Sequence, residues 1–106
     1  MTTFDRREEA FENMFVHDEE LHFKAKSRRT KLLAAWAAQR MGRTGAAAED
    51  YAHSVVAFAV ANGSDGALVT RVHEDLQAAG ATVSDTDIRA EMDRLMTQSL
   101  AAVRRG

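Results

Sequence analysis

The feature that most limits the fold of this 106-residue chain is its residue bias: it has no proline, a single isoleucine (Ile88) and 20 alanines. β-branched residues are enriched in β-strands and proline is common in the turns between them, whereas alanine has the highest helix propensity. We therefore expect an all-α protein, and the length suits one domain. The absence of cysteine excludes disulfides, a thiol nucleophile and a thiolate metal site.

Three glycines follow stretches rich in alanine or leucine, in the position of a helix-ending C′ residue: Gly42, Gly63 and Gly80. Each is followed by a residue suited to a helix N-cap: Thr44, Ser64 and Ser84. Ser84 and Asp87 approximate a capping box. The three glycines and the cap residues that follow them predict four helices.

Apolar residues recur at three- and four-residue steps between these glycines. The stripes consist of Ala48, Tyr51, Ala52, Val55, Val56 and Ala59; of Leu68, Val69, Val72, Leu76 and Ala79; and of Ile88, Met92, Leu95, Met96 and Val103. The end of the first helix adds Leu32, Leu33, Trp36 and Met41. These stripes predict a four-helix bundle from about Leu32 to Val103, with Trp36 at the centre of its core.

The first 31 residues have a different character. Seven acids and two bases lie between Asp5 and Glu20, and five bases with no acid lie between Lys24 and Lys31. Between Val16 and Lys31 the apolar residues are few: Leu21, Phe23 and Ala25. A helix that is polar on most faces either projects into solvent or binds a partner. The basic run suits either contact with an acidic partner surface or a solvated, charged helix.

An aromatic stripe lies at the front of the chain. Phe4, Phe11 and Phe15 share one helical face, with Met14 beside them, while Phe23 does not join it and suits a boundary contact. The entropy cost of ordering such a segment roughly cancels or exceeds the gain from burying these side chains on the bundle. We therefore expect residues 1–18 to be mobile when free and helical when bound to a partner, and residues 19–106 to form the bundle.

Other motifs indicate no chemistry. His17 and His22 are five residues apart and so do not share a helical metal site, although histidine is the residue type used in pH-sensitive elements, so that role stays open. Gly42-Arg43-Thr44-Gly45 lacks the ending of a phosphate loop. No serine has a recognisable His and Asp partner. We therefore expect that the protein is not an enzyme and that it has no metal site and no cofactor.

The chain resembles a known family across nearly its whole length. The residues that carry the resemblance are Ala10-Phe11-Glu12, Phe15, Asp18-Glu19-Glu20, Phe23-Lys24, Arg28-Arg29, Lys31-Leu32-Leu33 and Trp36-Ala37-Ala38, followed by Gly42, Gly45, Tyr51-Ala52, Val55-Val56, Asp75-Leu76, Gly80, Ser84, Ile88-Arg89, Met92 and Leu95. On these residues the chain resembles the zeta subunit of the alphaproteobacterial F-type ATP synthase, an ATPase inhibitor protein.

The resemblance implies a four-helix bundle whose N-terminal segment inserts into the catalytic head of ATP synthase and blocks hydrolysis. The implied partners are the alpha, beta and gamma subunits, at a catalytic interface near the rotor. The residues it implies at the partner interface are Phe4, Arg6, Arg7, Glu8, Glu9, Phe11, Glu12, Met14 and Phe15. It also implies a protein that is monomeric when free and cytoplasmic, held at the inner face of the membrane through ATP synthase without inserting into the lipid.

The sequence departs from the family pattern in two places. Met14 stands where a lysine is expected, which removes a charge from the inserting segment. The stretch 57–62, Ala-Phe-Ala-Val-Ala-Asn, replaces a more acidic end of the second helix.

Two alternative functions remain. One is a helical domain that senses a small ligand such as a nucleotide, with Arg28, Arg29 and Lys31 near its phosphates or against an acidic partner. The other is a nucleic-acid-binding protein that uses the basic stretch 24–31, against which the net charge of −2 argues.

Overall fold

Four α-helices make up nearly all of the described backbone. The computed structural model describes the backbone of residues 3–105 and the side chains of residues 18–105. The helices are α1 (Thr3–Arg40), α2 (Gly45–Asn62), α3 (Asp65–Ala78) and α4 (Asp85–Arg105). No strand occurs between residues 3 and 105. The predicted all-α, four-helix fold is confirmed.

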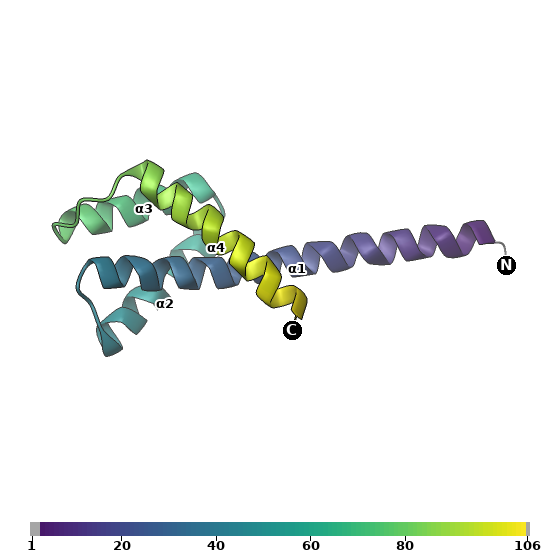
Figure 1. Ribbon diagram of the computed structural model, residues 1–106, viewed down its shortest axis with the longest axis horizontal. Coiled ribbons are helices and arrows are strands. Elements are labelled where there is room, and N and C mark those ends of the chain that lie inside the picture. The colour runs from purple at the N-terminus through teal and green to yellow at the C-terminus, as the bar shows by residue number, and fades with distance from the viewer. Residues whose placement is uncertain (1–2, 106) are drawn as a thin grey trace.

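Helix α1 is much longer than the others and has two environments. Its 38 residues form one uninterrupted helix, and only its second half packs against the other three helices (Figure 1). The first half extends away from them, so the molecule measures 64 Å along its long axis and 25 × 23 Å across. The helix passes the expected boundary at residue 18 without a break. The mobility expected of residues 1–18 in the free protein stays a prediction.

The bundle core is built from most of the predicted stripe residues, whereas Ala79 is exposed. Buried apolar side chains of α2, α3 and α4 are Tyr51, Val55, Leu68, Val69, Val72, Leu76, Ile88, Met92 and Leu95. Val83, in the loop before α4, belongs to the same core. These residues have the three- and four-residue spacing that places side chains on one helical face.

Helix α1 meets this core with small side chains. Ala34, Ala37 and Ala38 are fully buried beside Leu33, and their size lets the neighbouring helices approach closely. Trp36 is only partly buried at the edge of the core, with the Arg40 guanidinium 5.2 Å from the centre of its ring. The prediction that Trp36 is the centre of the core is therefore wrong, because alanines occupy the inner face of α1.

The packed part of α1 begins earlier than predicted. Ala25, Arg29 and Thr30 are buried, and Ala25 lies about two helical turns before Leu32. Thr30 Oγ1 donates a hydrogen bond to the Lys26 carbonyl (3.0 Å), and Arg29 binds Asp65 of α3. Polar residues can occupy the inner face of α1 because they find partners within the chain.

The first three helices end next to the glycines that were predicted to terminate them. The three glycines have positive φ angles, of 77° at Gly42, 67° at Gly63 and 80° at Gly80. At Gly80 the chain forms a Schellman motif, in which the Gly80 amide donates to the Gln77 carbonyl (3.0 Å) and the Ala81 amide donates to the Leu76 carbonyl (2.9 Å).

The three predicted N-caps differ in quality. Ser64 Oγ accepts a hydrogen bond from the Ala67 amide (3.3 Å), and Ser84 Oγ accepts one from the Asp87 amide (3.1 Å). Thr44 precedes α2 in an extended conformation but makes no cap hydrogen bond with its side chain. Two of the three predicted caps are therefore confirmed as side-chain caps.

Candidate partner-binding helix

The N-terminal half of α1 contains the nine residues that the family resemblance implies at the interface with the ATPase head. Its backbone continues the helix of the bundle away from the other three helices (Figure 1). The side chains of these nine residues lie outside the described part of the chain: Phe4, Arg6, Arg7, Glu8, Glu9, Phe11, Glu12, Met14 and Phe15. His17 lies outside it as well. The predicted contacts of these residues stay predictions.

The described side chains begin with an acidic, solvent-facing turn. Asp18, Glu19 and Glu20 are exposed, and so is His22. Leu21 is half-buried, so the bundle begins to cover α1 at this point. The emerging helix is therefore polar where it leaves the bundle, as the charge pattern predicted.

The basic run that follows is divided between the surface and the core. Lys24, Arg28 and Lys31 are exposed, Lys26 is half-buried, and Arg29 is only 5% exposed. One member of the predicted basic surface, Arg29, thus has a role inside the fold. Arg28 and Lys31 remain on the surface for the predicted contact with a nucleotide or an acidic partner, which stays a prediction.

Arg29 ties α1 to the first residue of α3. Its Nη2 donates to Asp65 Oδ1 (3.0 Å) and its Nη1 donates to Asp65 Oδ2 (3.3 Å), a fork geometry suited to a carboxylate. Lys26 Nζ lies 3.8 Å from Asp65 Oδ1. The hydrogen bond from Arg29 is the main reason that the pKa of Asp65 lies below its ordinary value of 3.8. The pair fixes where α1 enters the bundle.

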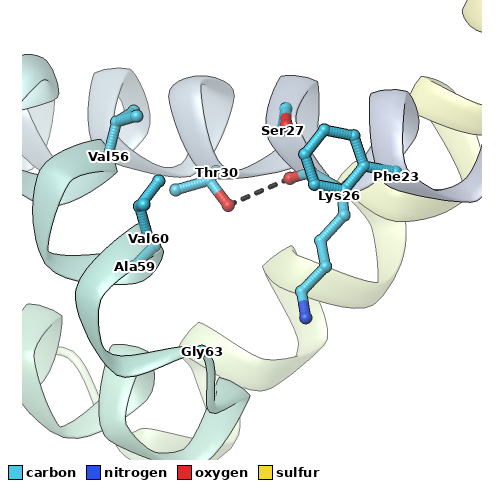
Figure 2. A pocket seen from close by; sticks show the side chains of 8 residues that line it. All are labelled: Phe23, Lys26, Ser27, Thr30, Val56, Ala59, Val60 and Gly63. Carbon is cyan, nitrogen blue, oxygen red and sulfur yellow. Dashed lines mark hydrogen bonds between the residues drawn. The ribbon is translucent and has the colours of Figure 1, made fainter.

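An apolar groove lies beside this entry point, between α1 and the end of α2. Phe23, Lys26, Ser27 and Thr30 of α1 face Val56, Ala59 and Val60 of α2 across a cavity of about 280 Å³, which ends at Gly63 (Figure 2). Phe23 is 72% exposed and Val60 is 82% exposed. The predicted boundary position of Phe23 is thus an exposed one, and its ring lies at the rim of the groove.

A second polar cluster joins α2 to α3 and was not predicted. Tyr51 Oη donates to Asp75 Oδ2 (2.9 Å), and Arg71 Nε donates to the same oxygen (2.9 Å). The Arg43 guanidinium lies 5.0 Å from the centre of the Tyr51 ring. Burial and the Asp75 carboxylate raise the pKa of Tyr51 well above its ordinary value of 10. No sequence signal pairs Tyr51 with Asp75, because the two lie on different helices.

The remaining histidines occupy the surface or its boundary. His53 is exposed and His73 is half-buried, and His73 Nδ1 lies 3.4 Å from Asp85 Oδ1. Within the described residues no cluster of three potential metal ligands occurs. In the same part of the chain, no helix combines the length and apolar character needed to cross a membrane.

The comparison with known families agrees with this architecture. The family model of ATPase inhibitor subunit zeta matches residues 1–102. The chain belongs to this family. The comparison with curated proteins found no match to the chain.

The zeta-family match covers both the projecting part of α1 and the bundle. It confirms the resemblance found in the sequence and supports a role as an ATPase inhibitor. A zeta-family chain is an inhibitor subunit by its family's description, which agrees with the expectation that this protein is not an enzyme. The same description supports an association with ATP synthase.

Proposed function

We propose that this chain inhibits ATP hydrolysis by the catalytic head of an F-type ATP synthase, and that it does so by inserting the N-terminal half of α1. The observation that carries the proposal is the extension of α1 beyond the bundle in a chain of the ATPase inhibitor family (Figure 1). A single helix of this kind fits between subunits. The bundle, with a cross-section near 25 × 23 Å, remains outside.

The length of the projecting helix suits deep insertion. Residues 3–20 span roughly 27 Å at 1.5 Å per residue. Phe4, Phe11 and Phe15 fall on one face of this helix by their spacing of seven and four. Each large apolar side chain that becomes fully buried contributes roughly 1.5–3 kcal/mol. Three such anchors supply enough binding energy to hold a helix at an interface.

Charged residues in and around this face provide the polar contacts. Arg6, Arg7, Glu8, Glu9 and Glu12 suit the polar rim of an interface between a catalytic subunit, a non-catalytic subunit and the rotor. A helix wedged there blocks rotation in the hydrolytic direction. The alpha, beta and gamma subunits are thus the proposed partners, and they would hold the chain at the cytoplasmic face of the membrane.

Deletion of residues 1–18 tests the proposal. The truncated chain should keep a cooperative thermal transition, because the packed part of α1 begins near Ala25, and it should no longer inhibit ATP hydrolysis by the purified head. Replacement of Phe4, Phe11 and Phe15 by serine in the full chain should have the same effect. Inhibition that persists undiminished in either variant contradicts insertion.

The nucleotide alternative has a separate test. Arg29 is already bound to Asp65, so Arg28 and Lys31 would have to supply the phosphate contacts. Titration of the full chain with ATP or ADP, followed by amide chemical shifts, should then give saturable changes around these two residues. Shifts that never saturate contradict the alternative.

A further inference from the structure

Helix α2 carries more apolar surface than the bundle covers. Its stretch 55–61 contains seven consecutive apolar residues, of which one, Val55, is fully buried. Phe58 is covered in part by the Arg71 guanidinium, 5.1 Å from its ring. Val60 and the neighbouring alanines, Ala57 and Ala61, are exposed. A contiguous exposed apolar face on a small protein marks an interaction surface.

This apolar face of α2 continues onto α1. Phe23 and Val60, the largest exposed apolar side chains described, flank the groove drawn in Figure 2. A second hollow follows on the same seam, lined by Lys31 of α1 and by residues of α2 that include Ala52, Val56 and Ala57. Val56 lines both hollows. We call these two adjacent hollows together the α1–α2 groove.

The α1–α2 groove has the size and lining of a seat for a helix. It follows α2 from Glu49 to Gly63, roughly 21 Å at 1.5 Å per residue, or about four helical turns. Its lining includes small side chains, among them Ser27, Ala52 and Ala59. Small residues let a second helix approach closely.

The charges on the α1 side indicate which helix would fit. Lys26 and Lys31 line the two hollows, and Lys24 and Arg28 are exposed on the same helix, whereas Arg29 is buried. Glu49 lies at the far end of the groove, and Asp65 is already paired with Arg29 and Lys26. The complementary partner is therefore an amphipathic helix with an apolar stripe and carboxylates along the side that faces α1.

We propose that the α1–α2 groove is a second docking surface for the ATPase head, and that it binds an acidic amphipathic helix of the head while the N-terminal half of α1 inserts. The inference rests on the proposed function, because continuity with the inserting helix names the partner. Phe23 follows Phe15 by eight residues, roughly 12 Å along α1. A partner that encloses Phe15 is therefore within reach of Phe23 and of the groove beside it.

A second copy of this chain is the other occupant to consider. A twofold contact through the groove would bring two helices with basic 24–31 segments against each other, and like charges oppose such an approach. Sedimentation of the full chain should therefore give a monomer at micromolar concentration. A dimer that becomes monomeric when Phe23 and Val60 are replaced by serine would overturn the proposal.

The central experiment measures inhibition and binding of the purified ATPase head by the full-length double variant Phe23→Ser, Val60→Ser. Both side chains are exposed, so the thermal transition should be unchanged. Loss of two buried apolar contacts should weaken binding about tenfold or more. The matched control Ala90→Ser, Ala101→Ser changes two exposed positions on α4 and should bind as the parent chain does.

The outcomes separate this proposal from the proposed function. If the parent chain inhibits and the double variant inhibits equally well, the groove is not a docking surface, although insertion stands. If the parent chain neither binds nor inhibits the head, the proposed function fails and this proposal fails with it. Weaker binding in the double variant, with the control unchanged, supports the groove.

A charge reversal tests the chemistry of the partner. Lys31→Glu, at the groove, should weaken binding about twofold to fivefold at low salt and less at high salt. Arg40→Glu is the matched control, because Arg40 is exposed on the same helix but lines neither hollow. Tighter binding by Lys31→Glu, or an equal loss in both variants, contradicts an acidic helix in the groove.

Discussion

Replacing Asp65 by asparagine should destabilise the bundle although Asp65 itself is half-exposed. The reason is Arg29, whose side chain is only 6% exposed while that of Asp65 is 51% exposed. Arg29 Nε is buried without a hydrogen-bond partner among the described residues, so the two contacts to Asp65 are what compensates the buried guanidinium. Asparagine offers one neutral acceptor in place of the carboxylate.

The size of the effect follows from the exposure of the pair. Removing one partner of a fully buried ion pair costs about 3–5 kcal/mol, whereas an exposed pair contributes about 0–1 kcal/mol. With one partner buried and the other half-exposed, we expect Asp65→Asn to cost about 1–2 kcal/mol. In a domain of this length that loss lowers the melting temperature by roughly 5–15 °C.

Urea denaturation followed by circular dichroism measures this loss, and Asp87→Asn is its control. Asp87 also lies in the first turn of a helix, so both variants lose the favourable interaction with the helix dipole, but Asp87 forms no ion pair within residues 18–105. A loss at Asp65 no larger than that at Asp87 would refute the reasoning. In an Arg29→Met background, Asp65→Asn should cost little beyond the dipole effect, because the buried charge has been removed.

The same pair predicts a pH dependence. The pKa of Asp65 is lowered in the folded chain, chiefly by the hydrogen bond from Arg29. A lowered pKa contributes stability that is complete above the unfolded value of 3.8 and is lost as the pH falls through the folded value. The difference between the parent chain and Asp65→Asn should therefore shrink in acid below about pH 4. A difference that stays constant down to pH 2 contradicts the assignment.

Two further predictions concern α2 and α3. Tyr51→Phe should lower the free energy of unfolding by about 1 kcal/mol, because it removes the hydrogen bond to Asp75. Since the pKa of Tyr51 is raised in the folded chain, the parent chain should also lose stability as the pH rises above about 10. The tyrosinate absorbance of this single tyrosine should then appear only as the chain unfolds. Gly66→Ala should stabilise α3 by about 0.5–1 kcal/mol, because the new methyl group meets only Ser64 Oγ at 3.6 Å. Gly80→Ala should destabilise by about 1 kcal/mol, because Gly80 has a φ of +80°. Opposite signs for the two glycines in chemical denaturation would support this, and equal signs would contradict it.

The helix count, the helix ends and most of the core could be predicted from the sequence because they depend on local chemistry. Glycine at Gly42, Gly63 and Gly80 and serine at Ser64 and Ser84 act within one turn of their own helix. The apolar spacing in α3 and α4 reports directly on one buried face.

The part of α1 inside the bundle could not be predicted in the same way. Large side chains suggested Trp36 as the core centre, but alanines occupy the inner face because helix packing depends on distance between axes as well as on hydrophobicity. In the sequence Arg29 cannot be distinguished from the surface bases around it, because its partner Asp65 lies 36 residues later in the chain. The α1–α2 groove likewise depends on Phe23 and Val60 being brought together by the fold.

The continuity of α1 has a consequence for helix formation itself. Starting a helix is unfavourable by a factor near 10⁻³, whereas each added residue forms one hydrogen bond at little or no net cost. The bundle holds the turns of α1 from about Ala25 onward, so the residues before them extend an existing helix rather than nucleate a new one. The four-helix bundle thus acts as a permanent helix nucleus for the N-terminal half of α1, and it favours the conformation in which that half would meet its partner.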